Sequence, residues 1–306
     1  MKFVALAGGV GGAKLVDGLA QLLPPKNLTI IVNTGDDFEH QGLSISPDLD
    51  TVCYTLAGLA NPETGWGRRE ETFHVLESFQ ELGCPTWFRL GDRDLATHIE
   101  RTRRLREGQS LSQITRDFCQ AWGVQQTILP MSDEPVRTMV DTTDEGELTF
   151  QEYFVHRKCE PRVKGFHFAG IASARPAKGV LAAIEHADGI VICPSNPWVS
   201  IDPILAVAGI KSALASKLVV GVSPIISGQT VKGPAAKMYA EFGIQPSAIA
   251  VAHHFSKILS GFVLDNLDAN LLPKIPIPAK TTNILMKNHD DRRRLAQDVL
   301  DLIQTL

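Results

Sequence analysis

Five consecutive apolar residues near the start of the chain, Phe3 to Ala7, lead directly into a loop that contains four glycines. An uninterrupted apolar run of this length is typical of a strand buried on both faces, as strands are in a parallel sheet. From Leu15 onward apolar residues recur at helical spacing, which predicts a helix after the loop. A strand, a glycine turn and a helix start together predict an anion site, because free N–H groups and the positive end of the helix dipole face the turn.

The glycine loop matches neither of the two common phosphate-binding fingerprints. It consists of Gly8, Gly9, Val10, Gly11, Gly12, Ala13 and Lys14. A Walker A loop carries Ser or Thr after its lysine, where Leu15 stands, and a Rossmann fingerprint that begins at Gly9 needs glycine in place of Lys14. We interpret the loop as a phosphate site of neither type, to which Lys14 adds a charge. The alternative is a tight turn whose glycines serve packing alone.

Polar loops follow four of the strands that the sequence predicts. The first is the glycine loop, and the others are residues 33–37, 194–197 and 223–228. In open α/β sheets, ligands bind at the carboxyl ends of the strands, so we expect these loops to converge on one edge. The alternative is that Ser, Asn, Pro and Gly are ordinary loop residues.

Strand-like runs alternate with helical patterns along most of the chain. This order predicts an α/β fold with a doubly wound, mostly parallel Rossmann-like sheet. The expected strands are Phe3–Ala7, Leu28–Val32, 127–131, 166–171, 190–193, 219–222 and 249–252; the expected helices include 51–60, 178–187, 203–214, 234–242 and 290–303. Residues 38–47 are predicted to be a loop.

We treat residues 1–306 as one α/β domain that carries two additions. Helical patterns at 69–82, 94–106 and 112–122 predict a helical insertion over residues 64–125. Alternating residues at 136–142 and 148–155 predict a β-hairpin. The arginines of the second insertion helix, at positions 101, 103, 104 and 106, are interpreted as a solvated face, with capture of an acidic ligand tail as the alternative.

Composition excludes several classes of partner. The net charge of −4 over 306 residues gives no basic field for nucleic acid, and no apolar stretch is long enough to span a membrane. Five scattered cysteines without a C-x-x-C pair indicate free thiols in a reducing compartment, so we expect a cytoplasmic protein. A homodimer is the expected oligomeric state on general frequency.

Three carboxylates near the predicted phosphate site are candidates for chemistry. Asp36 and Asp37 follow the second strand, and Asp50 stands near the start of a helix. Such oxygen ligands beside a phosphate indicate Mg²⁺, and one carboxylate would instead act as a base. The alternatives are a turn residue for Asp36 and a helix N-terminal charge for Asp50. Asp94 is interpreted as a helix cap, with His98 on the same helix.

Several longer motifs, in order along the chain, resemble the 2-phospho-L-lactate transferases of coenzyme F420 biosynthesis. They are residues 8–15, 33–37, 46–51, 87–98, 130–133, 194–197 and 232–238. The resemblance implies that a phosphorylated three-carbon acid moves from a guanosine diphosphate-linked donor to the ribityl hydroxyl of the deazaflavin Fo. The product is an F420-0 species, GMP leaves, and Mg²⁺ is required.

The resemblance also implies residue roles. Asp50 and Arg89 correspond to positions that contact the deazaflavin in the family, where lysine is common at the second position. The glycine loop, Ser195 and Asn196 correspond to the nucleotide side. On this basis Lys14, the loop amides and Mg²⁺ neutralise the diphosphate, Asp37 helps to hold the metal, and Asp50 orients or deprotonates the attacking hydroxyl.

Two matters stay open at the level of sequence. Phospholactate, phosphoenolpyruvate and 3-phosphoglycerate differ by small groups that only pocket shape distinguishes. The superfamily resemblance extends to gluconeogenesis-factor-like proteins that bind nucleotide sugars, so a regulatory binding protein without transfer activity is the alternative function.

Overall fold

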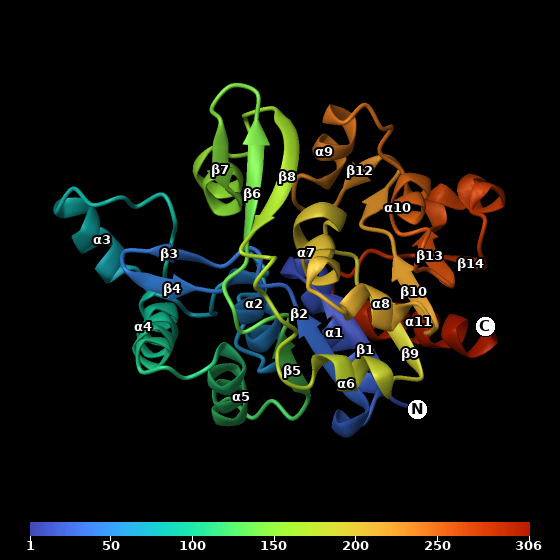
Figure 1. Cartoon of the computed structure of the whole chain (residues 1–306), viewed down its shortest axis with the longest axis horizontal. Helices are drawn as coiled ribbons and strands as arrows, with labels where there is room; N and C mark the ends of the chain where they lie inside the picture. The colour runs from blue at the N-terminus through green and yellow to red at the C-terminus, as the bar shows by residue number, and fades with distance from the viewer.

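The computed structural model describes residues 1–306 and is built on a seven-stranded parallel sheet (Figure 1). The strand order is β14-β13-β10-β9-β1-β2-β5. The strands are β1 (Phe3–Ala7), β2 (Leu28–Val32), β5 (Thr127–Pro130), β9 (Gly189–Ile192), β10 (Val219–Val222), β13 (Gly261–Asp265) and β14 (Ala279–Thr282). All six pairings are parallel, and β1 lies between β2 and β9, with Phe3 opposite both Leu28 and Gly189. The predicted doubly wound α/β fold is confirmed.

Helices cover both faces of this sheet, and the side chains of β1 alternate between two cores. Val4 and Leu6 belong to one apolar cluster, and Phe3, Ala5 and Ala7 belong to the other. The first cluster includes residues of α6 (Val180–Glu185), α7 (Asp202–Ala206), α8 (Ile210–Leu214) and α10 (Ala248–His254). The second includes residues of α1 (Gly9–Leu22), α2 (Pro47–Leu56), α5 (Leu111–Ala121) and α11 (His289–Thr305).

The remaining elements are a hairpin, a small antiparallel sheet and several short helices and strands. A hairpin of β3 (Phe38–His40) and β4 (Leu43–Ile45) lies with α3 (His74–Glu81) and α4 (Asp92–Arg106) to one side of the molecule, opposite β13 and β14 (Figure 1). A separate antiparallel sheet has the order β7-β6-β8. It consists of β6 (Arg137–Thr142), β7 (Glu147–Thr149) and β8 (Val163–Ala169). The other short elements are β11 (Ile225–Ile226), β12 (Gln229–Thr230), α9 (Ala235–Glu241), η1 (Pro25–Asn27), η2 (Glu152–His156), η3 (Pro197–Ile201) and η4 (Asn266–Lys274). None of the helices has the length and apolar composition that a membrane span requires.

Three predicted strands are wrong or misplaced. Residues 249–252 lie in helix α10, whose first turn is capped by the Ser247 hydroxyl. The strand at 166–171 exists as β8 but pairs antiparallel with β6, outside the central sheet. The second hairpin strand, predicted at 148–155, ends at Thr149 because residues 152–156 form a helical turn. The strands β13 and β14, which complete the sheet, were not predicted.

Several predicted boundaries also move. The helix predicted at 51–60 begins one turn earlier, at Pro47, and the predicted loop 38–47 contains β3 and β4. The single helix predicted at 203–214 is interrupted before Gly209, which has a φ of 88°. The helix predicted at 69–82 begins only at His74. Residues 69–70 form a turn instead, and the Glu71 carboxylate accepts hydrogen bonds from the Arg93 and Asp94 N–H groups at 2.6 and 3.1 Å. Glu71 therefore caps α4, and the role of helix cap predicted for Asp94 is wrong.

Candidate functional site

A cavity of about 580 Å³ lies at the carboxyl edge of the sheet, where the loops that follow β1, β2, β9 and β10 meet. These four strands are neighbours, so the expected convergence of their loops is observed. The residues from these loops that line the cavity are Gly8, Gly9, Val10, Gly11, Lys14, Asp36, Pro194, Ser195, Asn196, Ser223 and Pro224. Gly12 and Asp37, which the sequence also suggested, are not among the lining residues.

A larger hollow of about 820 Å³ lies between α5 and β5. It is lined by polar side chains such as Gln113 and Arg116 and contains none of the strand-end loop residues. We assign the functional site to the smaller cavity because four sheet loops and several buried carboxylates meet there.

The glycine loop packs closely against the loop that follows β9. A Cβ on Gly11 would lie 2.4 Å from the Pro194 carbonyl oxygen, and Gly9 has a φ of 63°. The Ser195 hydroxyl donates to the Gly8 carbonyl at 2.7 Å and accepts from the Gly8 N–H at 3.2 Å. Close packing therefore explains part of the glycine content, while α1 still begins at Gly9 and directs its N-terminus to the cavity wall.

Lys14 is the cation of this wall. Its Nζ donates to the Met286 carbonyl at 3.0 Å. Burial lowers its pKa, and the charges of Arg292 and Lys232 lower it further. Lys232 also lines the cavity, so two ammonium groups lie on the same wall as the glycine loop. An anionic group bound there would relieve their mutual repulsion.

Buried carboxylates, among them those of Asp36, Asp48 and Asp50, bring negative charge to the lining of the cavity. Burial, reinforced by the charge of Asp48, raises the pKa of Asp36 well above its usual range, and Oδ1 of Asp36 has no hydrogen-bond partner. Burial raises the pKa of Asp48 to about 6, although its carboxylate accepts from the Gly9 N–H at 2.7 Å and from the Asn33 side-chain amide at 2.9 Å. Two buried carboxylates that disfavour each other's charge, one with a free oxygen, fit a divalent cation.

Asp37 has a different environment from Asp36. Burial raises its pKa to about 7, and its Oδ2 accepts from the Ser46 hydroxyl at 2.7 Å. Its Oδ1 is also unpartnered, but the residue does not line the cavity. Asp48 takes its place beside Asp36, and the sequence analysis did not single it out as a site residue. Its spacing of two residues from Asp50 in the first turn of α2 is the sequence signal that points to it.

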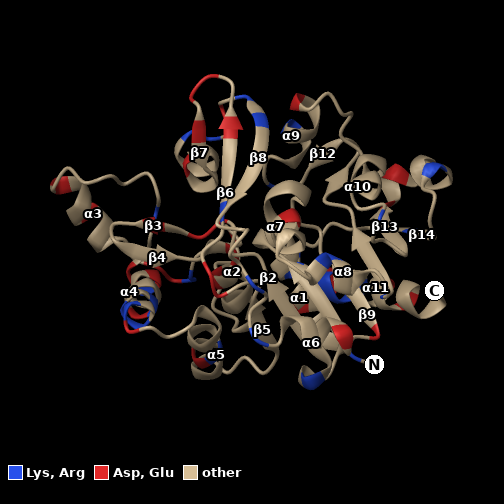
Figure 2. Ribbon diagram, viewed as in Figure 1, with Lys and Arg blue, Asp and Glu red and all other residues tan.

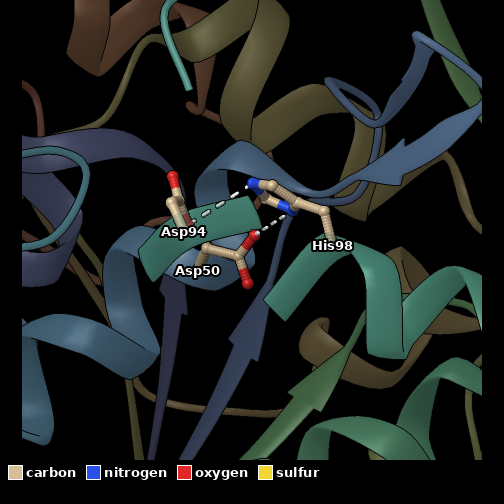
Figure 3. A group of neighbouring side chains, drawn as sticks. All are labelled: Asp50, Asp94 and His98. Atoms are coloured by element: carbon tan, nitrogen blue, oxygen red, sulfur yellow. Dashed lines mark ion pairs between the residues drawn. The ribbon is translucent and has the colours of Figure 1, made fainter. Parts of the chain in front are cut away.

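Asp50 is held by a buried arginine (Figure 3 shows Asp50 with its neighbours Asp94 and His98). Arg101 donates to Asp50 Oδ2 at 3.0 Å through Nη1 and to Oδ1 through Nη2, and its side chain is 2% exposed. The interpretation of the arginine cluster as a solvated face is therefore wrong for Arg101. It holds for the exposed Arg103, on a helix where both charge signs alternate (Figure 2). Asp94, His98 and Arg101 share one helix face, a spacing of four and three residues that the sequence displays.

Aromatic side chains form a further part of the cavity lining, the aromatic wall. Trp87 stacks on His156 with ring centroids 5.1 Å apart, and Phe88 meets Phe38 edge to face at 4.8 Å. Arg89 is exposed, lines the cavity and lies 4.4 Å from the centroid of the Phe73 ring. The other Trp, Tyr and Phe side chains of the lining are Trp66, Tyr54, Phe150 and Phe154. A wall of this kind suits a flat, partly apolar ligand.

The profile of the 2-phospho-L-lactate transferase CofD family matches residues 3–303. The chain belongs to this family. A protein of Streptomyces griseus named phosphoenolpyruvate transferase is 44% identical over 314 residues, and the alignment covers 99% of each chain. A protein of Methanosarcina acetivorans named 2-phospho-L-lactate transferase is 39% identical over 306 residues, again with 99% coverage of both. The chain is thus a transferase of the CofD type.

The fold has a more distant solved counterpart. A crystal structure of a UPF0052 family member from Bacillus halodurans covers 98% of this chain and 98% of its own, with a TM-score of 0.65 and 17% identity. This likeness supports the α/β architecture alone. The chemistry is argued from membership of the CofD family and from the residues of the site.

Proposed function

We propose that this CofD family member transfers a phosphorylated three-carbon acid from a guanosine diphosphate-linked donor to the ribityl hydroxyl of the deazaflavin Fo. The hydroxyl oxygen forms a bond to the phosphorus that carries the acid. The bond from that phosphorus to the oxygen shared with the guanosine phosphate breaks, GMP leaves, and the hydroxyl proton is released. The single observation that carries this proposal is one cavity that joins a glycine loop, buried carboxylates and an aromatic wall.

The donor would bind along the glycine loop. Gly8, Gly9 and Gly11 supply a backbone without side chains, and Lys14 supplies a charge for the diphosphate. Ser195 and Asn196 would lie on the nucleotide side. Their hydroxyl and carbonyl groups are already used within the protein, since the Asn196 side chain accepts from the Trp198 N–H at 3.1 Å, so we expect them to shape the loop.

The acceptor would bind against the aromatic wall. The helical insertion, residues 64–125, contributes Trp87, Phe88 and Arg89 to this wall, and the deazaflavin ring would lie against them. Asp50 would face the ribityl hydroxyl. Transfer between bound groups of this kind depends on their positioning and on neutralising charge more than on a covalent intermediate.

Asp36 and Asp48 would hold the Mg²⁺ ion, with Asp37 close by in the sequence but outside the lining. The unpartnered Oδ1 of Asp36 is the observation that supports this assignment. Bound Mg²⁺ supplies positive charge to the diphosphate oxygens. Lys14 and the loop amides would share this task beside the metal site, since the Gly9 N–H already donates to Asp48.

Phosphoenolpyruvate is the acid that we favour. Relatives named phosphoenolpyruvate transferase are 42% to 46% identical to the chain in three actinobacterial examples, whereas two methanogen proteins named 2-phospho-L-lactate transferase are 38% and 39% identical. The two acids differ by a methylene group against a methyl group, so a small change in pocket shape would select between them.

A competition experiment tests this proposal. The protein is incubated with Fo, Mg²⁺ and equal amounts of the guanylylated forms of phosphoenolpyruvate, 2-phospho-L-lactate and 3-phosphoglycerate, and the product masses are recorded. We expect the phosphoenolpyruvyl product to dominate. A dominant phospholactyl or phosphoglyceryl product would contradict the choice of acid, and binding of nucleotide without any product would contradict transfer and favour a binding protein.

A further inference from the structure

Arg101 reaches the cavity from a different part of the chain than the carboxylate that it holds. Asp50 lies on α2, beside the central sheet, and Arg101 lies on α4 in the helical insertion. Both side chains are almost fully buried, with exposed fractions of 8% and 2%. The guanidinium contacts both oxygens of the carboxylate, so rotation of the Asp50 side chain would break two charge-assisted hydrogen bonds.

The guanidinium is itself fixed by further contacts. Nη1 of Arg101 lies 3.1 Å from Nδ1 of His98 and 3.4 Å from the Ser44 carbonyl oxygen. Because a guanidinium only donates, Nδ1 of His98 accepts, and its proton is carried on Nε2. That nitrogen lies 3.4 Å from Asp94 Oδ1, which also accepts from the Tyr54 hydroxyl at 2.6 Å.

These contacts form one connected set that begins and ends on α2. Tyr54 is one turn beyond Asp50 on that helix, and Asp94, His98 and Arg101 lie on α4. Four of the five members, Asp50, Tyr54, Asp94 and His98, line the cavity. Arg101 does not line it and is placed to act on a ligand only through its neighbours.

We propose that Arg101 is a positioning residue, which fixes the Asp50 carboxylate in the orientation that accepts a hydrogen bond from the attacking hydroxyl. This inference rests on the proposed transfer reaction. Each carboxylate oxygen has a second lone-pair direction, so the pairing with Arg101 leaves room for one hydroxyl donor. The Arg101 guanidinium, which stays charged, contacts both carboxylate oxygens of Asp50. Asp50 therefore orients the attacking hydroxyl, and the proton of that hydroxyl passes to another acceptor in the cavity.

A merely structural ion pair gives a useful contrast on the same helix. Arg104 pairs with Asp117 of α5, and its side chain is 13% exposed. This pair also joins two helices of the insertion, but neither residue lines the cavity. Removing Arg104 thus removes a partly buried, ion-paired arginine from α4 without loss of an Asp50 contact.

The test compares five variants with the wild-type protein in the transfer assay, with donor affinity and thermal midpoint measured in parallel. The variants are Arg101→Met, Arg101→Lys, Asp50→Asn, the double variant Asp50→Asn/Arg101→Met, and the control Arg104→Met. We expect Arg101→Met to lower kcat about a hundredfold with unchanged affinity for the guanylylated donor, because a small misplacement of an orienting group is costly. Arg101→Lys should recover about tenfold of this loss, since it keeps the charge without the fork.

The double variant separates positioning from bulk stability. If Arg101 acts through Asp50, adding Arg101→Met to Asp50→Asn should cause no further loss of kcat, because the two residues work as a unit. Losses that multiply would overturn the proposal, as would Arg101→Met within about threefold of wild-type kcat, the scatter expected for independent sites. If Arg101→Met does not fold, the kcat of Arg101→Lys is compared with that of the wild type. The kcat of the charge-balanced double variant is then compared with that of Asp50→Asn.

The control and the wild type complete the set of outcomes. Arg104→Met should keep kcat while its thermal midpoint falls, and an equal loss of kcat in Arg104→Met would overturn a specific role for Arg101. If the wild type releases no GMP, the proposed function fails and the positioning role falls with it. Wild-type turnover with an unaffected Arg101→Met refutes the positioning role alone.

Discussion

Adding one methyl group at Gly11 should separate the two interpretations of the glycine loop. The Cβ of Gly11→Ala would lie 2.4 Å from the Pro194 carbonyl oxygen, a backbone atom that no rotamer change can move. Ordinary contact needs about 1 Å more, so the start of α1 and the loop after β9 must move apart. Both segments line the cavity, and the N–H groups that we assign to the diphosphate lie on one of them.

The expected magnitudes follow from opposing terms. Overpacking costs about 1–3 kcal/mol, and replacing a helical glycine by alanine returns about 1 kcal/mol, so the net loss of stability is about 0–2 kcal/mol. Displacing one or two charge-assisted hydrogen bonds of about 1.5–3 kcal/mol each should weaken nucleotide binding by about tenfold to a hundredfold or more. The affinity should therefore change far more than the thermal midpoint.

Isothermal titration calorimetry with GDP and Mg²⁺ measures this affinity directly. Gly165→Ala, on β8, is a suitable control, because its Cβ would meet only the Asp141 carboxylate at 3.4 Å. The control should bind GDP as the wild type does. If Gly11→Ala bound GDP with wild-type affinity, our assignment of the glycine loop to the donor phosphates would be refuted.

Three further predictions concern the carboxylates and the aromatic wall. Asp50→Asn should leave donor binding intact and lower kcat at least about a hundredfold, measured as GMP release; normal turnover would exclude the role of Asp50. Burial raises the pKa of Asp48 to about 6, whereas the same carboxyl in the unfolded chain releases its proton near pH 4. The protonated Asp48 therefore contributes stability that is fully present below about pH 4 and is lost as the pH rises through 6. The thermal midpoint of the metal-free protein should accordingly fall between about pH 4 and 6, Mg²⁺ should restore it most at the higher pH, and Asp48→Asn should flatten the profile; a flat wild-type profile would contradict this account. Arg89→Ala should raise the KM for Fo about tenfold without changing the KM for the donor, and equal changes in both would place Arg89 elsewhere.

The strands of the central sheet were predictable where an apolar run is followed directly by a glycine-rich or polar loop. The apolar run of β1 and the glycines that follow it fix one buried strand, and the polar ends of β2, β9 and β10 indicate the edge where ligands bind. Residues 249–252 were misread because a short apolar run has no decisive period, and the capping role of Ser247 selects the helix. The strand β8 was predicted, but its place was not, because a strand pattern does not specify which sheet the strand joins.

The candidate site was only partly predictable for a physical reason. Its glycine loop is local in sequence, so the pattern reveals it. The pairing of Asp50 with Arg101 joins residues 51 positions apart. The helical spacing of Asp94, His98 and Arg101 shows that they share a face, but it does not show that this face is buried while Arg103 is exposed. Asp48 was not singled out, because its contacts with Gly9 and Asn33 form through tertiary packing.

The most direct test of the central claim is a single-turnover reaction with the protein in excess over guanylylated phosphoenolpyruvate, in the presence of Fo and Mg²⁺. After quenching, GMP and the modified deazaflavin are quantified by mass spectrometry. Our account predicts that GMP and phosphoenolpyruvyl-Fo form in equal amounts and at the same rate. Intact donor that stays tightly bound, with neither product formed, would contradict it.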